Sequence, residues 1–207
     1  EPVRTSRLLP ENASAVLIGL HGRGGSASDM ITLFEELQVP NVAVLAPQAA
    51  GHTWYPNSFL APIESNQPWL DSALRRVEEL IVDLEQRGVT RSRIALLGFS
   101  QGACLASEFI ARHPSRYGGV MILTGGLIGP PGTPRNYQGS LSGTPVFIGT
   151  SVPDAHVPLE RVEETKREFE LLKGKVELRC YPGMPHTIHQ DEVEACRALL
   201  QELVGSK

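Results

Sequence analysis

A serine stands at the centre of the most specific chemical motif in this chain. Residues 98–102 read Gly-Phe-Ser-Gln-Gly and match the pattern G-x-S-x-G. An apolar segment, 94–99, leads to Ser100, and a run of small residues follows it, which predicts a strand, a sharp turn and a helix. Such a turn exposes the hydroxyl at the tip of a sheet, beside a helix N-terminus whose free N–H groups favour an oxyanion. The motif therefore predicts that Ser100 is a nucleophile.

A serine nucleophile needs a base, and the base needs an acid that orients it. In sites of this strand-turn-helix type the order along the chain is Ser, acid, His. Asp154 follows the apolar segment 146–149, and His186 follows 176–181, so both leave the carboxyl ends of predicted strands, as Ser100 does. We expect His186 to take the proton from Ser100 and Asp154 to hold the imidazole in the right tautomer.

Other titratable residues compete for these two roles. His189 lies at the predicted start of the last helix, and His156 is too close to Asp154 to complete the same site. Asp154 could instead cap the helix that follows it, and Asp191 is an alternative carboxylate. We favour His186 as the base and Asp154 as the acid.

A glycine-rich loop follows the first predicted buried strand, where residues 21–26 read His-Gly-Arg-Gly-Gly-Ser. We expect the backbone N–H groups of Arg23 and Gln101 to form an oxyanion hole. A phosphate site is a weaker interpretation, because the motif G-x-x-x-x-G-K-[ST] is absent. The side chain of Arg23 could face an anionic group of a substrate or form a surface salt bridge, and the salt bridge is favoured. His21 is interpreted as a structural residue.

The segment 52–60 is rich in aromatic residues, although only 6% of the chain is aromatic. It lies on a loop that should flank the serine. Trp54, Tyr55 and Phe59, together with Met184 beside the histidine, are predicted to line an apolar substrate pocket. Filling of the core beneath the loop is the competing interpretation.

The elements that must position these residues follow from the hydrophobic pattern. Short apolar runs alternate with longer segments of helical periodicity, which predicts an α/β fold with a mostly parallel sheet of about six or seven strands and helices on both faces. Strands, most of them buried on both faces, are expected over 15–20, 41–46, 93–99, 119–124, 144–149 and 176–181, with 3–9 a further candidate. Helices are expected over 28–38, 67–86, 101–112, 159–173 and 190–204. The irregular stretches 47–66 and 125–143 are long enough to be functional or mobile.

Length and composition limit the possible classes of protein. The 207 residues suit a single domain, 1–207, and the content of 41% hydrophobic and 20% charged residues is that of a globular protein. The net charge is −4 with scattered Lys and Arg, so nucleic acid is not expected as a partner. No apolar run approaches the roughly 18 residues that span a membrane. With no signal segment in the chain, a cytoplasmic location is expected.

The three cysteines, Cys104, Cys180 and Cys196, are widely spaced and form no cluster of zinc-binding spacing. They are predicted to be reduced residues of the core, and no metal site is expected.

Taken together, these features resemble the phospholipase/carboxylesterase family of α/β-hydrolases, which includes acyl-protein thioesterases and small bacterial carboxylesterases. The resemblance extends from about Ala15 onward and rests on His21-Gly22-x-Gly24, Trp54-Tyr55, the serine motif, Asp154 with Val157-Pro158, and Tyr181-x-Gly183-Met184-x-His186. It implies an α/β-hydrolase fold with a minimal lid and a cofactor-free, often dimeric hydrolase of esters or thioesters. Ser100, Asp154 and His186 match the triad of the family, and Arg23 and Gln101 match its oxyanion donors. The family usually has a hydrophobic residue where Arg23 stands.

We therefore expect a serine carboxylesterase that cleaves small-molecule esters of small to medium acyl groups through an acyl-enzyme on Ser100, without a cofactor. An acyl thioesterase is the alternative within the same chemistry. A hydrolase-like module that binds a ligand without turnover is the alternative from another class.

Overall fold

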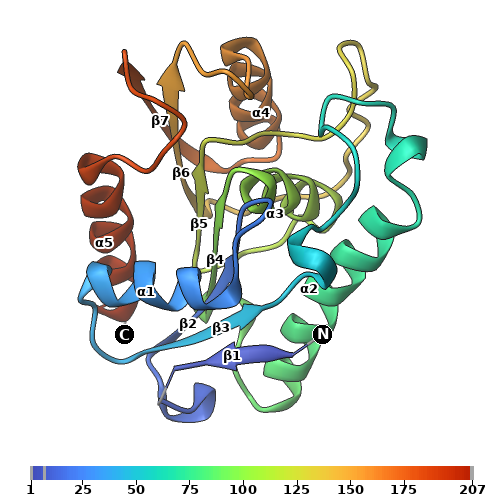
Figure 1. Ribbon diagram of the computed structural model, residues 1–207. Helices are drawn as coiled ribbons and strands as arrows, with labels where there is room; N and C mark the ends of the chain where they lie inside the picture. Colours follow the sequence, from blue (N-terminus) through green and yellow to red (C-terminus); the bar gives the residue numbers. More distant parts are fainter. Residues whose placement is uncertain (1, 7, 206–207) are drawn as a thin grey trace.

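In the part of the chain that the structure describes, seven strands form one sheet in the order β1-β3-β2-β4-β5-β6-β7 (Figure 1). The computed structural model of the chain describes residues 2–6 and 8–205. The neighbouring strands from β3 to β7 are all parallel, and β1 pairs with β3 in the antiparallel direction. The strands are β1 (Val3–Thr5), β2 (Ala15–Leu20), β3 (Val42–Pro47), β4 (Ile94–Phe99), β5 (Gly119–Leu123), β6 (Pro145–Val152) and β7 (Lys175–Pro182). The predicted mostly parallel sheet is confirmed. The short β1 falls in the candidate range 3–9, of which residue 7 lies outside the described residues.

The continuous apolar runs of the sequence become the buried strands. Every residue of β2, β3 and β5 is buried, as expected for parallel strands covered on both faces. The edge strand β7 pairs only with β6, and its residues are half-buried or exposed. For this reason the prediction of core cysteines is wrong for Cys180, which is exposed on β7, whereas Cys104 and Cys196 are buried.

Among the described residues, five α-helices cover the two faces of the sheet (Figure 1). They are α1 (Ala27–Leu37), α2 (Trp69–Gln86), α3 (Gln101–Arg112), α4 (Leu159–Leu171) and α5 (Gln190–Gly205). Successive residues of β2 show the two layers: Leu17 packs in one core with residues of α1 and α5, and Val16 packs in the other with residues of α2, α3 and α4. The prediction of helices on both faces is confirmed. Within the described part of the chain, no helix combines the length and the apolar character that a membrane span requires.

The glycine-rich loop after β2 ends in a well-capped helix. The Ser26 hydroxyl accepts a hydrogen bond from the Asp29 N–H at 3.3 Å, and the Asp29 carboxylate accepts one from the Ser26 N–H at 2.7 Å. This reciprocal capping box fixes the start of α1. It thereby also fixes the exit of the loop that contains Arg23.

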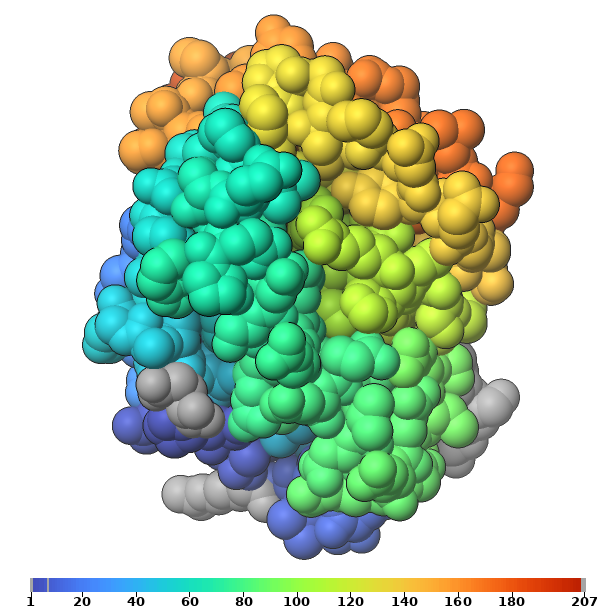
Figure 2. Space-filling model, turned by 90° about the vertical axis from the view of Figure 1, so that its right-hand side faces the viewer, coloured from blue at the N-terminus to red at the C-terminus, as the bar shows by residue number. Residues whose placement is uncertain are grey.

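The two long irregular stretches of the sequence lie side by side at the carboxyl end of the sheet. Figure 2 shows the segment after β3, in teal, against the segment after β5, in yellow. The Gly129 N–H donates a hydrogen bond to the Phe59 carbonyl at 2.7 Å and joins the two segments. From α4, the buried guanidinium of Arg161 donates to the Leu127 and Gly129 carbonyls, each at 2.6 Å. The two segments therefore form one connected wall above the strand ends.

Candidate active site

The backbone at Ser100 is held in an unfavourable conformation by its neighbours. Ser100 lies between β4 and α3 with φ 53° and ψ −116°, in a region that non-glycine residues rarely adopt. Its N–H donates to the Leu123 carbonyl of β5 at 2.9 Å. A Cβ at Gly102 would lie 2.0 Å from the Leu20 carbonyl oxygen, and one at Gly98 would lie 2.3 Å from the Gly102 oxygen. Both glycines are required because helix, turn and strand approach so closely.

Ser100, His186 and Asp154 form a continuous hydrogen-bonded chain. The Ser100 Oγ lies 2.8 Å from Nε2 of His186, and Nδ1 of the same ring lies 2.8 Å from Oδ2 of Asp154. The three residues follow β4, β7 and β6, and the carboxyl ends of these parallel strands meet at one edge of the sheet. With the Nδ1 proton donated to the carboxylate, Nε2 is free to accept the serine proton. The structure thus brings together the three residues that the sequence singles out.

The Asp154 carboxylate is arranged to remain ionised. Its side chain is fully buried, and Oδ1 accepts hydrogen bonds from the backbone N–H groups of His156 and Val157, both at 2.8 Å. Burial alone raises the pKa of this carboxyl, but the hydrogen bonds from His156, His186 and Val157 outweigh it, so that the pKa lies below its usual range. An ionised Asp154 is an acceptor that favours one orientation of the His186 ring.

Aromatic rings and a serine hydroxyl hold the His186 imidazole in place. The centroid of the Phe99 ring lies 5.4 Å from that of the His186 ring, and the His156 ring meets the His186 ring edge-on with 4.8 Å between the centroids. The Ser151 hydroxyl donates to the Pro185 carbonyl at 2.7 Å and fixes the loop just before the histidine.

The alternative base and acid lie in other networks. The Nδ1 atom of His189 accepts a hydrogen bond from the Asp191 N–H at 3.1 Å, at the start of α5. The Asp191 carboxylate binds the Tyr181 hydroxyl at 2.6 Å and the Arg179 guanidinium at 2.8 Å. Neither residue lines the cleft at Ser100.

The backbone N–H groups of Arg23 and Gln101 are available to an oxyanion. Gln101 is the first residue of α3, where N–H groups have no partner within the helix. In the described part of the chain no hydrogen bond occupies either N–H group. The loop of Arg23 lies against the serine, because a Cβ at Gly22 would come within 3.4 Å of the Ser100 Cβ. His21 supports this loop: its Nε2 accepts from the Ala49 N–H at 3.1 Å, and burial lowers its pKa.

Among the described residues, no carboxylate forms a salt bridge with the Arg23 side chain, so the favoured prediction of a surface salt bridge is wrong. Its guanidinium donates to the carbonyls of Tyr55, Pro56 and Asn57 at 2.9, 3.0 and 2.8 Å. These carbonyls lie more than thirty residues away along the chain, in the loop after β3, whose course the sequence does not reveal. Arg23 therefore fastens that loop to the loop after β2.

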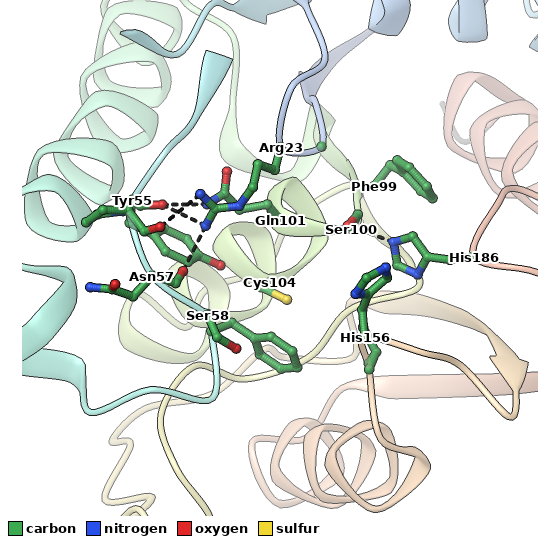
Figure 3. Close-up of a pocket in the computed structure, with 14 residues that line it drawn as sticks. Arg23, Tyr55, Asn57, Ser58, Phe99, Ser100, Gln101, Cys104, His156 and His186 are labelled. Atoms are coloured by element: carbon green, nitrogen blue, oxygen red, sulfur yellow. Dashed lines mark hydrogen bonds between the residues drawn. The ribbon is translucent and has the colours of Figure 1, made fainter. Parts of the chain in front are cut away.

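A cleft of about 610 Å³ opens at Ser100 (Figure 3). Of the residues predicted from the sequence, it is lined by Arg23, Tyr55, Phe59, Ser100, Gln101 and His186. Its lining also contains residues that the sequence does not single out for the pocket, among them Asn57, Ser58, Phe99, Cys104, His156 and Val157. Burial raises the pKa of the Cys104 thiol to about 12, so this cysteine does not supply a thiolate.

Two residues predicted for the pocket lie elsewhere. The Trp54 indole N–H donates to the His21 carbonyl at 2.8 Å. The indole ring packs on the His21 imidazole, with 4.9 Å between the ring centroids. Trp54 therefore fills the core beneath the loop, which was the competing interpretation. Met184 is half-buried and is not part of the lining, which contains His156 and Val157 beside His186.

The Gln101 side chain has a role that the sequence motif does not reveal. Its Oε1 accepts hydrogen bonds from the Trp54 N–H at 3.0 Å and from the Thr53 hydroxyl at 3.2 Å. Its Nε2 donates to the Tyr55 carbonyl at 2.8 Å. The residue after the serine thus anchors the loop that lines the cleft. A polar side chain at the start of a buried helix was the feature of the sequence that could have indicated this role.

The fold and this site define the chain as an α/β-hydrolase. A Phospholipase/Carboxylesterase family model matches residues 10–204, and the chain belongs to that family, as its motifs predict. The crystal structure of a phospholipase/carboxylesterase from Dyadobacter fermentans is 43% identical with a TM-score of 0.92, over 96% of this chain and 95% of that one.

Curated proteins are similar over most of their length. Acyl-protein thioesterase 1 of Saccharomyces cerevisiae is 25% identical, over 94% of this chain and 95% of the yeast protein. A probable carboxylesterase, SOBER1-like, of Arabidopsis thaliana is 23% identical, over 94% of this chain and 80% of the plant protein. The family and these relatives together identify this chain as an esterase-type hydrolase.

Proposed function

We propose that this chain hydrolyses carboxylic esters of small to medium acyl groups through an acyl-enzyme on Ser100. The observation that carries the proposal is the chain of two 2.8 Å hydrogen bonds from the Ser100 Oγ through His186 to Asp154. The strained backbone at Ser100 supports it further, because strain of this kind persists where function requires one side-chain direction.

In the first half of the reaction the ester carbonyl lies beside Ser100. The Oγ attacks the carbonyl carbon while Nε2 of His186 takes the hydroxyl proton. The resulting oxyanion accepts hydrogen bonds from the N–H groups of Arg23 and Gln101, and the helix dipole of α3 stabilises it further. The intermediate collapses with cleavage of the bond to the alcohol oxygen, which leaves with the proton from His186.

In the second half a water molecule attacks the acyl-Ser100 ester. His186 takes a proton from this water, and the same N–H groups stabilise the second oxyanion. The bond between the acyl carbon and Oγ then breaks, and Oγ recovers its proton from His186. The carboxylic acid leaves, and Asp154 stabilises the imidazolium at each stage.

Thioester hydrolysis is the second candidate, since the curated relatives include a protein named acyl-protein thioesterase. The same residues would act on a thioester carbonyl, with a thiol as the leaving group. A series of p-nitrophenyl esters and matched thioesters with acyl chains of two to twelve carbons separates the candidates. Ester cleavage that is fastest for short chains supports the proposal, and faster cleavage of the thioesters favours the second candidate.

The central experiment compares wild type with Ser100→Ala on a chromogenic short-chain ester. We expect kcat to fall by roughly 10³- to 10⁶-fold while the unfolding transition stays cooperative. The absence of turnover by wild-type protein across the whole series would overturn the proposal and favour a module that binds a ligand without chemistry.

A further inference from the structure

A positive charge lies on the wall of the cleft without a counterion among the residues that the structure describes. Guanidinium groups carry a permanent positive charge in proteins, and three carbonyls of the loop after β3 occupy three of the five N–H donors of Arg23. Carbonyl oxygens fix the position of a guanidinium but cancel none of its charge. In the part of the chain that the structure describes, no carboxylate forms an ion pair with it. Arg23 therefore presents a fixed cation to whatever enters the cleft.

The remainder of the lining does not offset this charge. None of the described residues that line the cleft is acidic. The carboxylate of Asp154 is fully buried behind His186 and accepts its hydrogen bonds there. An anionic substrate group in the cleft would thus meet a cation and no opposing carboxylate.

A second polar group in the lining has only a thiol as its neighbour. The Tyr55 hydroxyl belongs to a side chain that is only 1% exposed, and it makes no hydrogen bond to any nitrogen or oxygen of the described residues. Its polar neighbour is the Cys104 thiol, a weak acceptor that also lines the cleft. Burial raises the pKa of Tyr55 well above its usual range, so the hydroxyl keeps its proton. An oxygen of a bound ligand would be a stronger acceptor for this proton than the thiol is.

These two groups lie together, apart from the reacting residues. Figure 3 shows Arg23 and Tyr55 on one side of the cleft and His156 and His186 on the other. An acyl group attached to Ser100 can therefore extend away from His186 and toward Arg23 and Tyr55.

We propose that the cleft selects esters whose acyl part carries a second carboxylate, such as half-esters of short dicarboxylic acids. The distal carboxylate accepts hydrogen bonds from the Arg23 guanidinium and the Tyr55 hydroxyl. This inference rests on the proposed esterase function and names the substrate class for that site. Guanidinium pairs with carboxylates are among the strongest hydrogen-bonded contacts in proteins, so one such contact can decide specificity.

The test uses two esters that differ in one terminal group, mono-p-nitrophenyl glutarate and p-nitrophenyl pentanoate. The uncatalysed rate of each ester is subtracted, and the ratio of the two kcat/KM values defines the anion preference. We expect wild type to prefer the glutarate by about 10-fold or more. Because the charge of Arg23 is partly exposed to solvent, this preference should fall as NaCl is raised.

Two variants probe the two donors. In Arg23→Met the anion preference should fall by about 10- to 100-fold, and any loss common to both esters cancels in the ratio. Tyr55→Phe should lower it by about 10-fold without removing a charge. The matched control is Arg197→Met, because the Arg197 guanidinium also binds backbone carbonyls, those of Leu37 and Glu36, but lies outside the cleft. Its preference should equal that of wild type.

The possible failures can be told apart. Equal rates on the two esters, a preference for the pentanoate, or a preference unchanged in both Arg23→Met and Tyr55→Phe would overturn this inference and leave the esterase intact. If Arg23→Met does not fold, two other measurements decide: the salt dependence of the wild-type anion preference and the anion preference of Tyr55→Phe. If neither the added salt nor the Tyr55→Phe substitution changes the preference, the inference is overturned. No turnover of either ester above the Ser100→Ala level would overturn the proposed function itself.

Discussion

The side-chain oxygen of Gln101 accepts a hydrogen bond from the backbone N–H of Trp54 at 3.0 Å. The residue that follows the proposed nucleophile therefore also holds the loop that lines the cleft. Its own N–H is one of the two proposed oxyanion donors, so one residue links the position of the loop to the position of the reacting carbonyl.

Replacement of Gln101 should disturb the loop and the chemistry together. Gln101→Leu keeps the backbone N–H but leaves the Trp54 N–H without its acceptor, whereas the Tyr55 carbonyl loses one donor and keeps that of Arg23. We expect a loss of about 1 to 3 kcal/mol in the free energy of unfolding, faster hydrogen exchange at the Trp54 amide and a lower kcat/KM. Gln67→Leu is the control, since the Gln67 side chain binds only Asp71 at the surface. Unchanged exchange at Trp54 in Gln101→Leu would contradict the anchoring role.

The glycines of the serine turn should not tolerate a methyl group. At Gly102 alanine is the better helix former, yet its Cβ would lie 2.0 Å from the Leu20 carbonyl oxygen. We expect Gly102→Ala to lower the free energy of unfolding by about 3 kcal/mol or more, measured by urea denaturation. Gly205→Ala is the matched control, because a Cβ at that helical glycine meets nothing within 4 Å. Equal stability of the two variants would contradict the close approach of α3 to β2.

The choice between the two candidate acids can be tested with isosteric amides. Asp154→Asn places an NH₂ donor or a weaker acceptor against Nδ1 of His186, so the ring loses its favoured tautomer. We expect kcat on a short-chain ester to fall by roughly 10²- to 10⁴-fold. Asp191→Asn should change kcat little, because that carboxylate binds Arg179 and Tyr181. A large loss in Asp191→Asn with a small one in Asp154→Asn would reverse the assignment.

A buried carboxyl on α5 should make stability fall as the pH rises. Glu192 is 1% exposed, its Oε1 has no partner among the described residues, and burial raises its pKa to about 7. The folded chain thus holds this proton more tightly than the unfolded chain, whose glutamate pKa is about 4.3, and the resulting stability is lost as the pH rises from about 4 to 7.

Glu192→Gln should remove this dependence. We compare the unfolding free energies of Glu192→Gln and wild type by urea denaturation. From pH 5 to pH 8, the difference between them should shift by about 2 to 3 kcal/mol in favour of the variant, because only wild type loses stability. The exposed Glu194 on the same helix gives the control Glu194→Gln, which should follow wild type. Parallel pH curves for wild type and Glu192→Gln would exclude a titrating Glu192.

The fold and the three hydrogen-bonded residues were accessible from the sequence because each depends on local signals. Ser100, Asp154 and His186 each follow an apolar run, and parallel strands bring their carboxyl ends to one edge. Glycines on both sides of the serine indicate the turn in the sequence. The close backbone approaches at Gly98 and Gly102 explain why glycine is required there.

The lining of the cleft was less accessible because it depends on contacts between distant loops. Arg23 meets carbonyls 32 to 34 residues away, and no local pattern states that these oxygens will converge on it. Trp54 and Tyr55 are neighbours in sequence, yet Trp54 packs on His21 while Tyr55 lines the cleft. An aromatic composition predicts burial, but the direction of each ring depends on the backbone of the loop.

A burst experiment tests most directly whether His186 activates Ser100. Wild type mixed rapidly with a p-nitrophenyl ester should release a burst of up to one nitrophenolate per chain, and mass spectrometry of the quenched protein should find the acyl group on the peptide that contains Ser100. In His186→Ala both the burst and the acyl group should be absent, and in His189→Ala both should persist. Acylation of another residue, or a full burst without His186, would contradict the account.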